Sequence, residues 1–207
     1  MKFRLLLFCI ALACGCATDR YDLTLRGVKY HDDASPMLSE LVEAVTPEAM
    51  PDTGLKALIL PFAVRQDVGV RREVGRELGD VFRQTWLEKR VFEVMEFESS
   101  LPWPGLTEAL ALARAKGANF LVTGNVTQFF EGSGTGRTSI ALTIEIHWVP
   151  SATVIWSAAQ AAVMEAGLDK DYVVVRTTRR LPEQPTYAVI RALSESLAEG
   201  FVRHFAR

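Results

Sequence analysis

The sequence predicts an α+β domain, with a mixed sheet of about four to five strands, two crossover helices and a C-terminal helix packed on the sheet. Three observations support this prediction. Apolar runs of strand length alternate with amphipathic helical segments between residues 55 and 130, which is the order of a crossover unit. A glycine-rich loop then joins two segments of alternating polarity. Finally, the chain closes on a helical stripe of apolar residues.

The first half of the domain supplies the crossover elements. Residues 56–64 form an almost continuous apolar run, typical of a strand that is covered on both faces, and we expect Pro61 to end it or to lie at an edge. Residues 70–90 have one apolar helical face, and residues 92–97 alternate as a half-buried strand does. A second helix is predicted over 107–116, with Gly117 as its C-terminal cap.

The second half supplies a meander and the last helix. Residues 120–130 predict a third strand, and the glycine-rich stretch 132–136 predicts a hairpin tip that leads into an alternating strand ending at Trp148. A fifth strand is expected over 154–164. From 186 to 205, apolar residues recur every four positions, which places them on the side of a helix that faces the sheet.

The composition is typical of a globular protein and excludes several function classes. Of the 207 residues, 49% are hydrophobic and 23% are charged. The net charge of -2 lacks the basic excess that binding to a phosphate backbone requires, so nucleic acid is not an expected partner. All three cysteines fall within the first sixteen residues, which excludes a disulfide scaffold, a zinc–cysteine site and a cysteine nucleophile from the folded body. We expect no cofactor and no metal.

The N-terminus has the pattern of an export signal. Two basic residues precede the apolar run 5–13, which is shorter than the roughly 20 residues of a transmembrane helix. The next residues, Leu12-Ala13-Cys14-Gly15-Cys16, resemble the processing box of bacterial lipoproteins, in which a small residue precedes the acylated cysteine. We favour Cys16, because Gly15 precedes it and the chain becomes polar at once afterwards. Cys14 is the competing acceptor, and an ordinary cleaved signal peptide is the alternative.

These patterns predict three regions, which are a lipoprotein signal peptide over 1–15, a lipid-anchored tether over 16–54 and a single periplasmic α+β domain over 55–207. Four apolar residues of the tether recur at helical spacing before Pro47 and favour a short helix: Leu38, Leu41, Val42 and Val45. Residue 17 is Ala, whereas Asp at this position resembles an inner-membrane retention signal. We therefore expect an outer-membrane anchor with the domain facing the periplasm.

Three strings resemble a group of envelope proteins. They are Ala57-Leu58-Ile59-Leu60-Pro61-Phe62, residues 115–127 and Ser151-Ala152-Thr153-Val154-Ile155-Trp156-Ser157-Ala158. They are similar to strings in the periplasmic domain of the curli-secretion lipoprotein, the N-terminal domain of the TolB translocation protein and the outer-membrane activators of penicillin-binding proteins. The resemblance covers residues 55–205 and implies a fold more than a function.

Two departures from that group limit which function the resemblance implies. A secretion pore carries extra membrane strands of about 9–11 residues each, and this chain is too short for both the domain and a barrel. The activators carry a long disordered tether, whereas the tether expected here spans only 17–54. The chain therefore departs from both patterns.

No catalytic constellation stands out in the sequence. The stretch 132–137 lacks the Lys-Ser/Thr of a phosphate-binding loop, and its register does not match the serine elbow of hydrolases. His147 lies on the strand face opposite the isoleucines, and we expect it to be solvated. An envelope hydrolase remains the alternative from another class, and substitution of Ser133, His147 or Glu145 would test it.

The candidate contact residues are aromatic and basic. Trp103 stands between two prolines, and Phe129 and Phe130 stand beside the glycine tip, where a core does not require two consecutive Phe residues. The alternative for Trp103 is a ring folded over the sheet edge. Arg179 and Arg180, with Arg176, form a small basic patch, for which a solvated loop is the alternative.

The sequence thus predicts an outer-membrane-anchored lipoprotein that is a non-catalytic protein-binding or assembly module in the periplasm. Its partners would be the membrane, through the N-terminal lipid, and an envelope protein. The first alternative is a subunit of an oligomeric secretion or outer-membrane complex, in which copies of the chain contact one another.

Overall fold

The computed structural model describes residues 20–24, 27–47, 56–132, 136–165, 170–171, 175–180, 182 and 184–204. The predictions for the signal peptide and for Cys14 and Cys16 lie outside the described residues. The chain divides into two compact units. The larger comprises residues 35–166 and 181–207, and the smaller comprises residues 1–34 and 167–180.

The larger unit is built on a mixed sheet of eight strands. Its main path runs in the order β3-β10-β9-β8-β5-β7, and in addition β4 pairs with β10 and β6 pairs with β8. The strands are β3 (Met37–Leu38), β4 (Val42–Val45), β5 (Lys56–Ile59), β6 (Ala63–Val64), β7 (Val94–Phe97), β8 (Phe120–Phe130), β9 (Thr138–Trp148) and β10 (Thr153–Met164).

The α+β class and the five predicted strands are therefore confirmed, but the predicted total of about four to five strands is too low. The strands that the prediction missed, β3, β4 and β6, are two to four residues long. A period of two cannot be recognised over so short a stretch. As expected, the first apolar run stops as a strand before Pro61, at Ile59.

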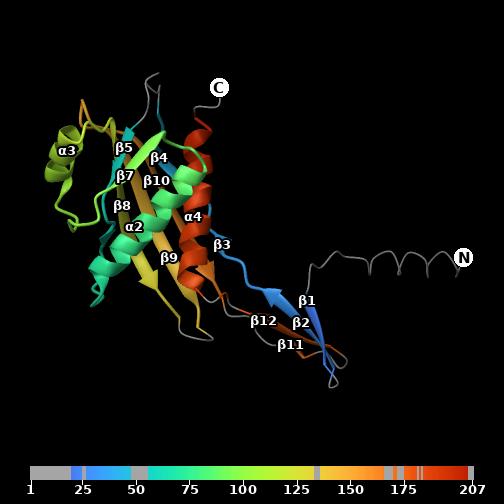
Figure 1. Cartoon of the computed structure of the whole chain (residues 1–207). Coiled ribbons are helices and arrows are strands. Elements are labelled where there is room, and N and C mark those ends of the chain that lie inside the picture. The colour runs from blue at the N-terminus through green and yellow to red at the C-terminus, as the bar shows by residue number, and fades with distance from the viewer. Residues whose placement is uncertain are drawn as a thin grey trace, which may run out of the picture. The chain divides into compact units, whose positions relative to one another are not determined.

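Three helices cover the sheet, α2 (Arg71–Glu88), α3 (Leu106–Ala115) and α4 (Pro185–Val202). Strands β5, β7 and β8 are parallel, so α2 and α3 are crossover connections, whereas β8, β9 and β10 form the predicted antiparallel meander. Helices α2 and α4 pack against each other in front of the sheet (Figure 1). Gly117 ends the turn after α3 with a φ of 64°, as its predicted capping role requires.

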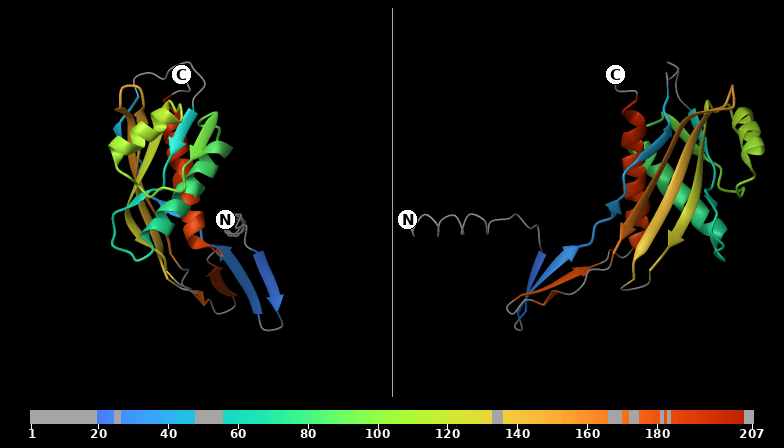
Figure 2. Two further views of the ribbon diagram at one scale, coloured as in Figure 1. Left: turned by 60° about the vertical axis from the view of Figure 1, so that its left-hand side comes forward. Right: turned by 180° about the vertical axis from the view of Figure 1, so that it is seen from behind.

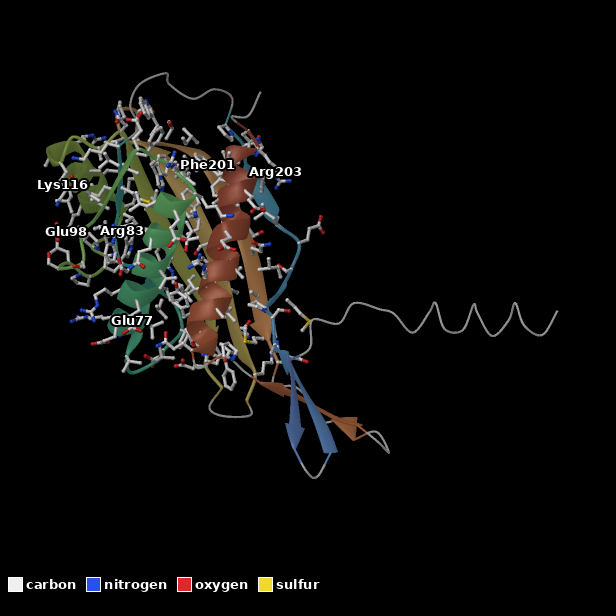
Figure 3. All side chains as sticks on the ribbon, turned by 45° about the vertical axis from the view of Figure 1, so that its right-hand side comes forward. Glu77, Arg83, Glu98, Lys116, Phe201 and Arg203 are labelled. Atoms are coloured by element: carbon white, nitrogen blue, oxygen red, sulfur yellow. The ribbon has the colours of Figure 1, made fainter. Side chains whose placement is uncertain are left out.

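The core lies between the sheet and the pair α2 and α4, and its centre is aromatic. The indole of Trp86 is fully buried and packs on four other rings, those of Phe82, Phe92, Trp156 and Phe201. Its Nε1–H donates a 3.0 Å hydrogen bond to the carbonyl of Ser194, so the only polar atom of the ring is satisfied. Figure 3 shows Phe201 near the C-terminal end of α4.

A second, smaller core lies on the opposite face of the sheet. Successive side chains of a strand point to opposite faces of the sheet. Leu58 and Leu60, two residues apart, therefore both face away from α2 and pack with α3. Leu121 of β8 joins the same cluster, against Leu110 and Ala113 of α3. Seen from behind in Figure 2, α3 lies to one side of the long strands β9 and β10.

Strands replace the short helix that the sequence favoured near residue 40. β3 and β4 pair with β10 along the edge of the sheet. The stretch between Pro36 and Pro47 is too short for a helix that is stable by itself, and β10 offers it a free edge with unpaired backbone groups. Specific contacts then fix its position. Leu41 fills space left by Gly200, where a Cβ would collide with its side chain.

The smaller unit is a sheet of four strands, β1 (Arg20–Thr24), β2 (Gly27–Asp33), β11 (Lys170–Asp171) and β12 (Val175–Arg180). The order is β1-β2-β12-β11, with β2 and β12 parallel. The stretch predicted as a tether therefore holds strands from residue 20 onwards. The register sets Arg179 opposite Asp32 and Arg180 opposite Asp33.

Candidate functional site

A cavity of about 490 Å³ lies in the larger unit, where the N-terminal halves of α2 and α4 meet the end of β8. We call it the α2–α4 pocket. Its apolar lining includes Val74, Leu78 and Ile190, which are buried core residues of the two helices. Because α4 begins at Pro185, its first turn forms one wall of the pocket.

The polar lining of the pocket is acidic. Three carboxylates contribute, Glu77 and Asp80 from α2 and Glu131 from the end of β8, and no Lys, Arg or His is among the described lining residues. Asp80 is already engaged, since it accepts hydrogen bonds from Arg83 at 3.1 Å and from the Gln84 side-chain amide at 2.8 Å. In contrast, Glu77 makes no hydrogen bond or ion pair with any described residue. Figure 3 shows Glu77 on the N-terminal part of α2.

Two aromatic rings complete the lining, Phe129 from β8 and Tyr187 from the first turn of α4. Hydrogen bonds hold both elements in place. The Phe129 N–H donates to Oε1 of Gln66 at 2.9 Å, and the Thr186 hydroxyl donates to Glu131. Phe130, next along β8, is 53% exposed. Phe129 pairs with Ile140 and Phe130 pairs with Ser139, and side chains alternate along a strand, so the Phe130 ring lies on the face of β8 opposite the pocket.

The structure thus brings together some of the residues predicted as contacts and separates others. Phe129 lines the pocket, whereas Phe130 is exposed on the opposite face of β8. Trp103 is partly buried against the α3 cluster, which agrees with the alternative of a ring folded over the sheet, so a contact role for it stays a prediction. Arg179 and Arg180 lie on β12, in the smaller unit. Residues 133–135 of the glycine-rich tip lie outside the described residues.

Sequence reasoning missed Tyr187, Glu77 and Glu131 as pocket residues. Each belongs to a segment whose pattern is explained by an ordinary solvated helix face or a strand end. They meet only because β8 ends where α2 and α4 converge. The one local signal was the pair Phe129-Phe130, which alternation along β8 does not require.

The prediction that His147 is solvated is wrong, because its side chain is 1% exposed. Its cross-strand neighbours are Leu121 and Val154, and Leu121 belongs to the α3 cluster, so this part of the second sheet face is covered as well. Burial lowers the pKa of His147, against the opposing effect of the Glu145 carboxylate 3.4 Å from Nε2. A histidine so completely buried has no access to a substrate.

Over the described residues, no group of three or more His, Cys, Asp or Glu side chains is placed to hold a metal ion. None of the described helices combines the length and the apolar character that crossing a bilayer demands.

Similarity to known proteins is visible in the fold alone. No protein-family model and no curated protein matches the chain. Among solved structures, the PelC dodecamer from Paraburkholderia phytofirmans aligns with a TM-score of 0.53 and 16% identity, over 81% of this chain and 96% of that one. A variant of the same protein aligns with a TM-score of 0.51 and 15% identity, over 80% and 98%. Lipoprotein GNA1162 from Neisseria meningitidis gives a TM-score of 0.42 and 8% identity, over 73% and 98%.

The larger unit has an α+β fold in which a crossover unit leads into a meander and a closing helix. PelC is a solved structure to which the chain is similar in fold. At 16% identity the likeness establishes a shared fold and leaves the function to be argued from the site.

Proposed function

We propose that this protein is a lipid-anchored binding or assembly module of the bacterial outer membrane, which faces the periplasm and binds an envelope protein without catalysing a reaction. The single observation that carries the proposal is the α2–α4 pocket, in which two aromatic rings and three carboxylates line one cavity. The buried rings at the centre of the core pack on one another, as those of Trp86, Phe92 and Phe201 do, whereas Tyr187 is 40% exposed at the pocket, where a partner can contact it.

The anchor is tested by metabolic labelling with an alkyne fatty acid. We expect the chain to incorporate the label, and we expect Cys16→Ala to abolish the incorporation while Cys14→Ala retains it. Loss of label only in the Cys14 variant would move the anchor to that residue. A wild-type chain without label, recovered in the soluble periplasmic fraction, would contradict the lipid-anchored form of the proposal.

The likeness to a dodecamer favours a second candidate, a subunit of an oligomeric outer-membrane complex. In that case the exposed end of the domain would contact further copies of the chain. Native mass measurement of the detergent-extracted lipoprotein separates the candidates. A monomer supports the module with a foreign partner, and a closed ring of copies supports the oligomeric subunit.

A further inference from the structure

We propose that the α2–α4 pocket binds a cationic side chain, an Arg in particular, that a protein partner inserts into it. The inference rests on the proposed binding function and specifies the chemistry of the partner.

The charged part of the pocket lining is acidic. All charged groups among the described lining residues are carboxylates, and Glu77 has no partner in the described structure. Two nearby arginines already have carboxylate partners. Arg83 pairs with Asp80, and Arg191 is held by Glu88 at 3.0 Å and Glu195 at 3.1 Å. An incoming cation therefore finds at least one carboxylate that no cation of the described chain neutralises.

Two aromatic rings in the lining favour a guanidinium as the cation. Phe129 and Tyr187 come from different elements and both line the pocket. A guanidinium binds favourably over an aromatic face, and more so when it is partly withdrawn from water. Arg191 donates a 3.2 Å hydrogen bond to the Tyr187 hydroxyl, which fixes this ring without occupying the carboxylates.

Apolar residues line the rest of the pocket. Val74, Leu78 and Ile190 line the same cavity, so the methylene stem of a long side chain has an apolar surface to cover while its charged end meets the acidic rim. This combination of an apolar wall, two rings and carboxylates matches arginine better than a small cation, which would use only the carboxylates.

The test uses the full lipoprotein in detergent, with its tyrosines replaced by 3-fluorotyrosine, and follows the ¹⁹F resonance of Tyr187, assigned by Tyr187→Phe. The probes are acetyl-Gly-Arg-Gly-amide, its neutral citrulline analogue, and glucosamine. We expect the Arg peptide to shift the Tyr187 resonance saturably and the citrulline peptide not to shift it. We expect 0.5 M salt to weaken the binding, because the contact is electrostatic.

Two variants give the test its specificity. Glu77→Gln combined with Glu131→Gln should weaken the Arg peptide about fivefold or more, since each solvent-accessible ion pair contributes modestly. Glu73→Gln is the matched control, an exposed carboxylate on the same helix that does not line the pocket, and should leave the affinity unchanged. Equal binding of the citrulline peptide, no shift with any probe, or a shift with glucosamine alone would each overturn the proposal.

Photo-crosslinking from position 130 in cells distinguishes failure of the inference from failure of the proposed function. An adduct that persists in the Glu77→Gln, Glu131→Gln variant would retain the binding function and remove the cationic side chain from it. Absence of an adduct in the wild type would remove the binding function itself.

Discussion

The carboxylate of Glu43 provides a quantitative test of how the N-terminal segment is attached to the domain. Its Oε1 accepts hydrogen bonds from Nε1 of Trp156 at 2.9 Å and from Nε2 of His204 at 2.8 Å. β4 is thereby tied both to the buried core and to the end of α4. The indole of Trp156 is fully buried, so it has no access to water if the carboxylate is removed.

We expect Glu43→Ala to lower the free energy of unfolding at pH 7 by about 1–3 kcal/mol, the penalty for leaving a buried donor without its acceptor. For a unit of this size this corresponds to a decrease in melting temperature of roughly 2–10 °C. Glu43→Gln should have a smaller effect, since the amide oxygen can still accept from Trp156. Urea unfolding followed by tryptophan fluorescence measures all three proteins. Glu40→Ala, which is exposed on the same segment, is the control.

The same contact predicts a dependence on pH. Burial by itself raises the pKa of Glu43, but the hydrogen bonds from His204 and Trp156 outweigh it, so that the folded-state pKa lies below the ordinary value of 4.5. A carboxyl with a lowered folded-state pKa stabilises the fold above its unfolded-state pKa and loses this contribution as the pH falls through the folded-state value. The difference between wild type and Glu43→Ala should therefore shrink below about pH 4. Equal stability of Glu43→Ala and Glu40→Ala at pH 7 would refute the reasoning.

Three further predictions concern the core and the surface. Gly124→Ala should destabilise the fold by about 1–3 kcal/mol in urea unfolding, because a Cβ there collides with the ring of Phe62, whereas Gly69→Ala, with open space around it, should have little effect. Trp86→Ala should cost about 3–5 kcal/mol, since it removes the ring at the centre of the aromatic core, and a loss below 1 kcal/mol would contradict that packing. The pKa of Glu98 is lowered to about 2, chiefly by the hydrogen bond from Lys116 and next by that from Ser100. Lys116→Met should raise the pKa of Glu98 toward its ordinary value in an NMR titration, and Lys89→Met should not change it.

The main body of the fold could be predicted because its elements are long and their periodicity is clear. The apolar face of α2 and the alternation along β9 each persist over ten residues or more, so a single misleading residue does not hide them. Pro61 and Gly117 mark boundaries through backbone properties that do not depend on the rest of the molecule.

The remaining errors have a common physical origin in tertiary contacts. The segment around Leu41 has helical spacing, yet the free edge of β10 and the hydrogen bonds of Glu43 with Trp156 and His204 favour a strand there. His147 faces away from the isoleucines, but its cross-strand neighbour Leu121 belongs to the cluster that packs with α3. Neither partner is close in sequence, so no local pattern could have indicated these outcomes.

The most direct measurement of the central claim is site-specific photo-crosslinking of the full lipoprotein in cells, with the photoreactive residue at position 130, at the end of β8 between the pocket-lining residues Phe129 and Glu131. The matched control is position 94 on the edge strand β7, where Val94 is 47% exposed. Strand β5 separates β7 from β8 in the sheet. The account predicts a discrete protein adduct from position 130, weakened by Glu77→Gln with Glu131→Gln, and no such adduct from position 94. No adduct from either position, or equal adducts from both, would contradict it.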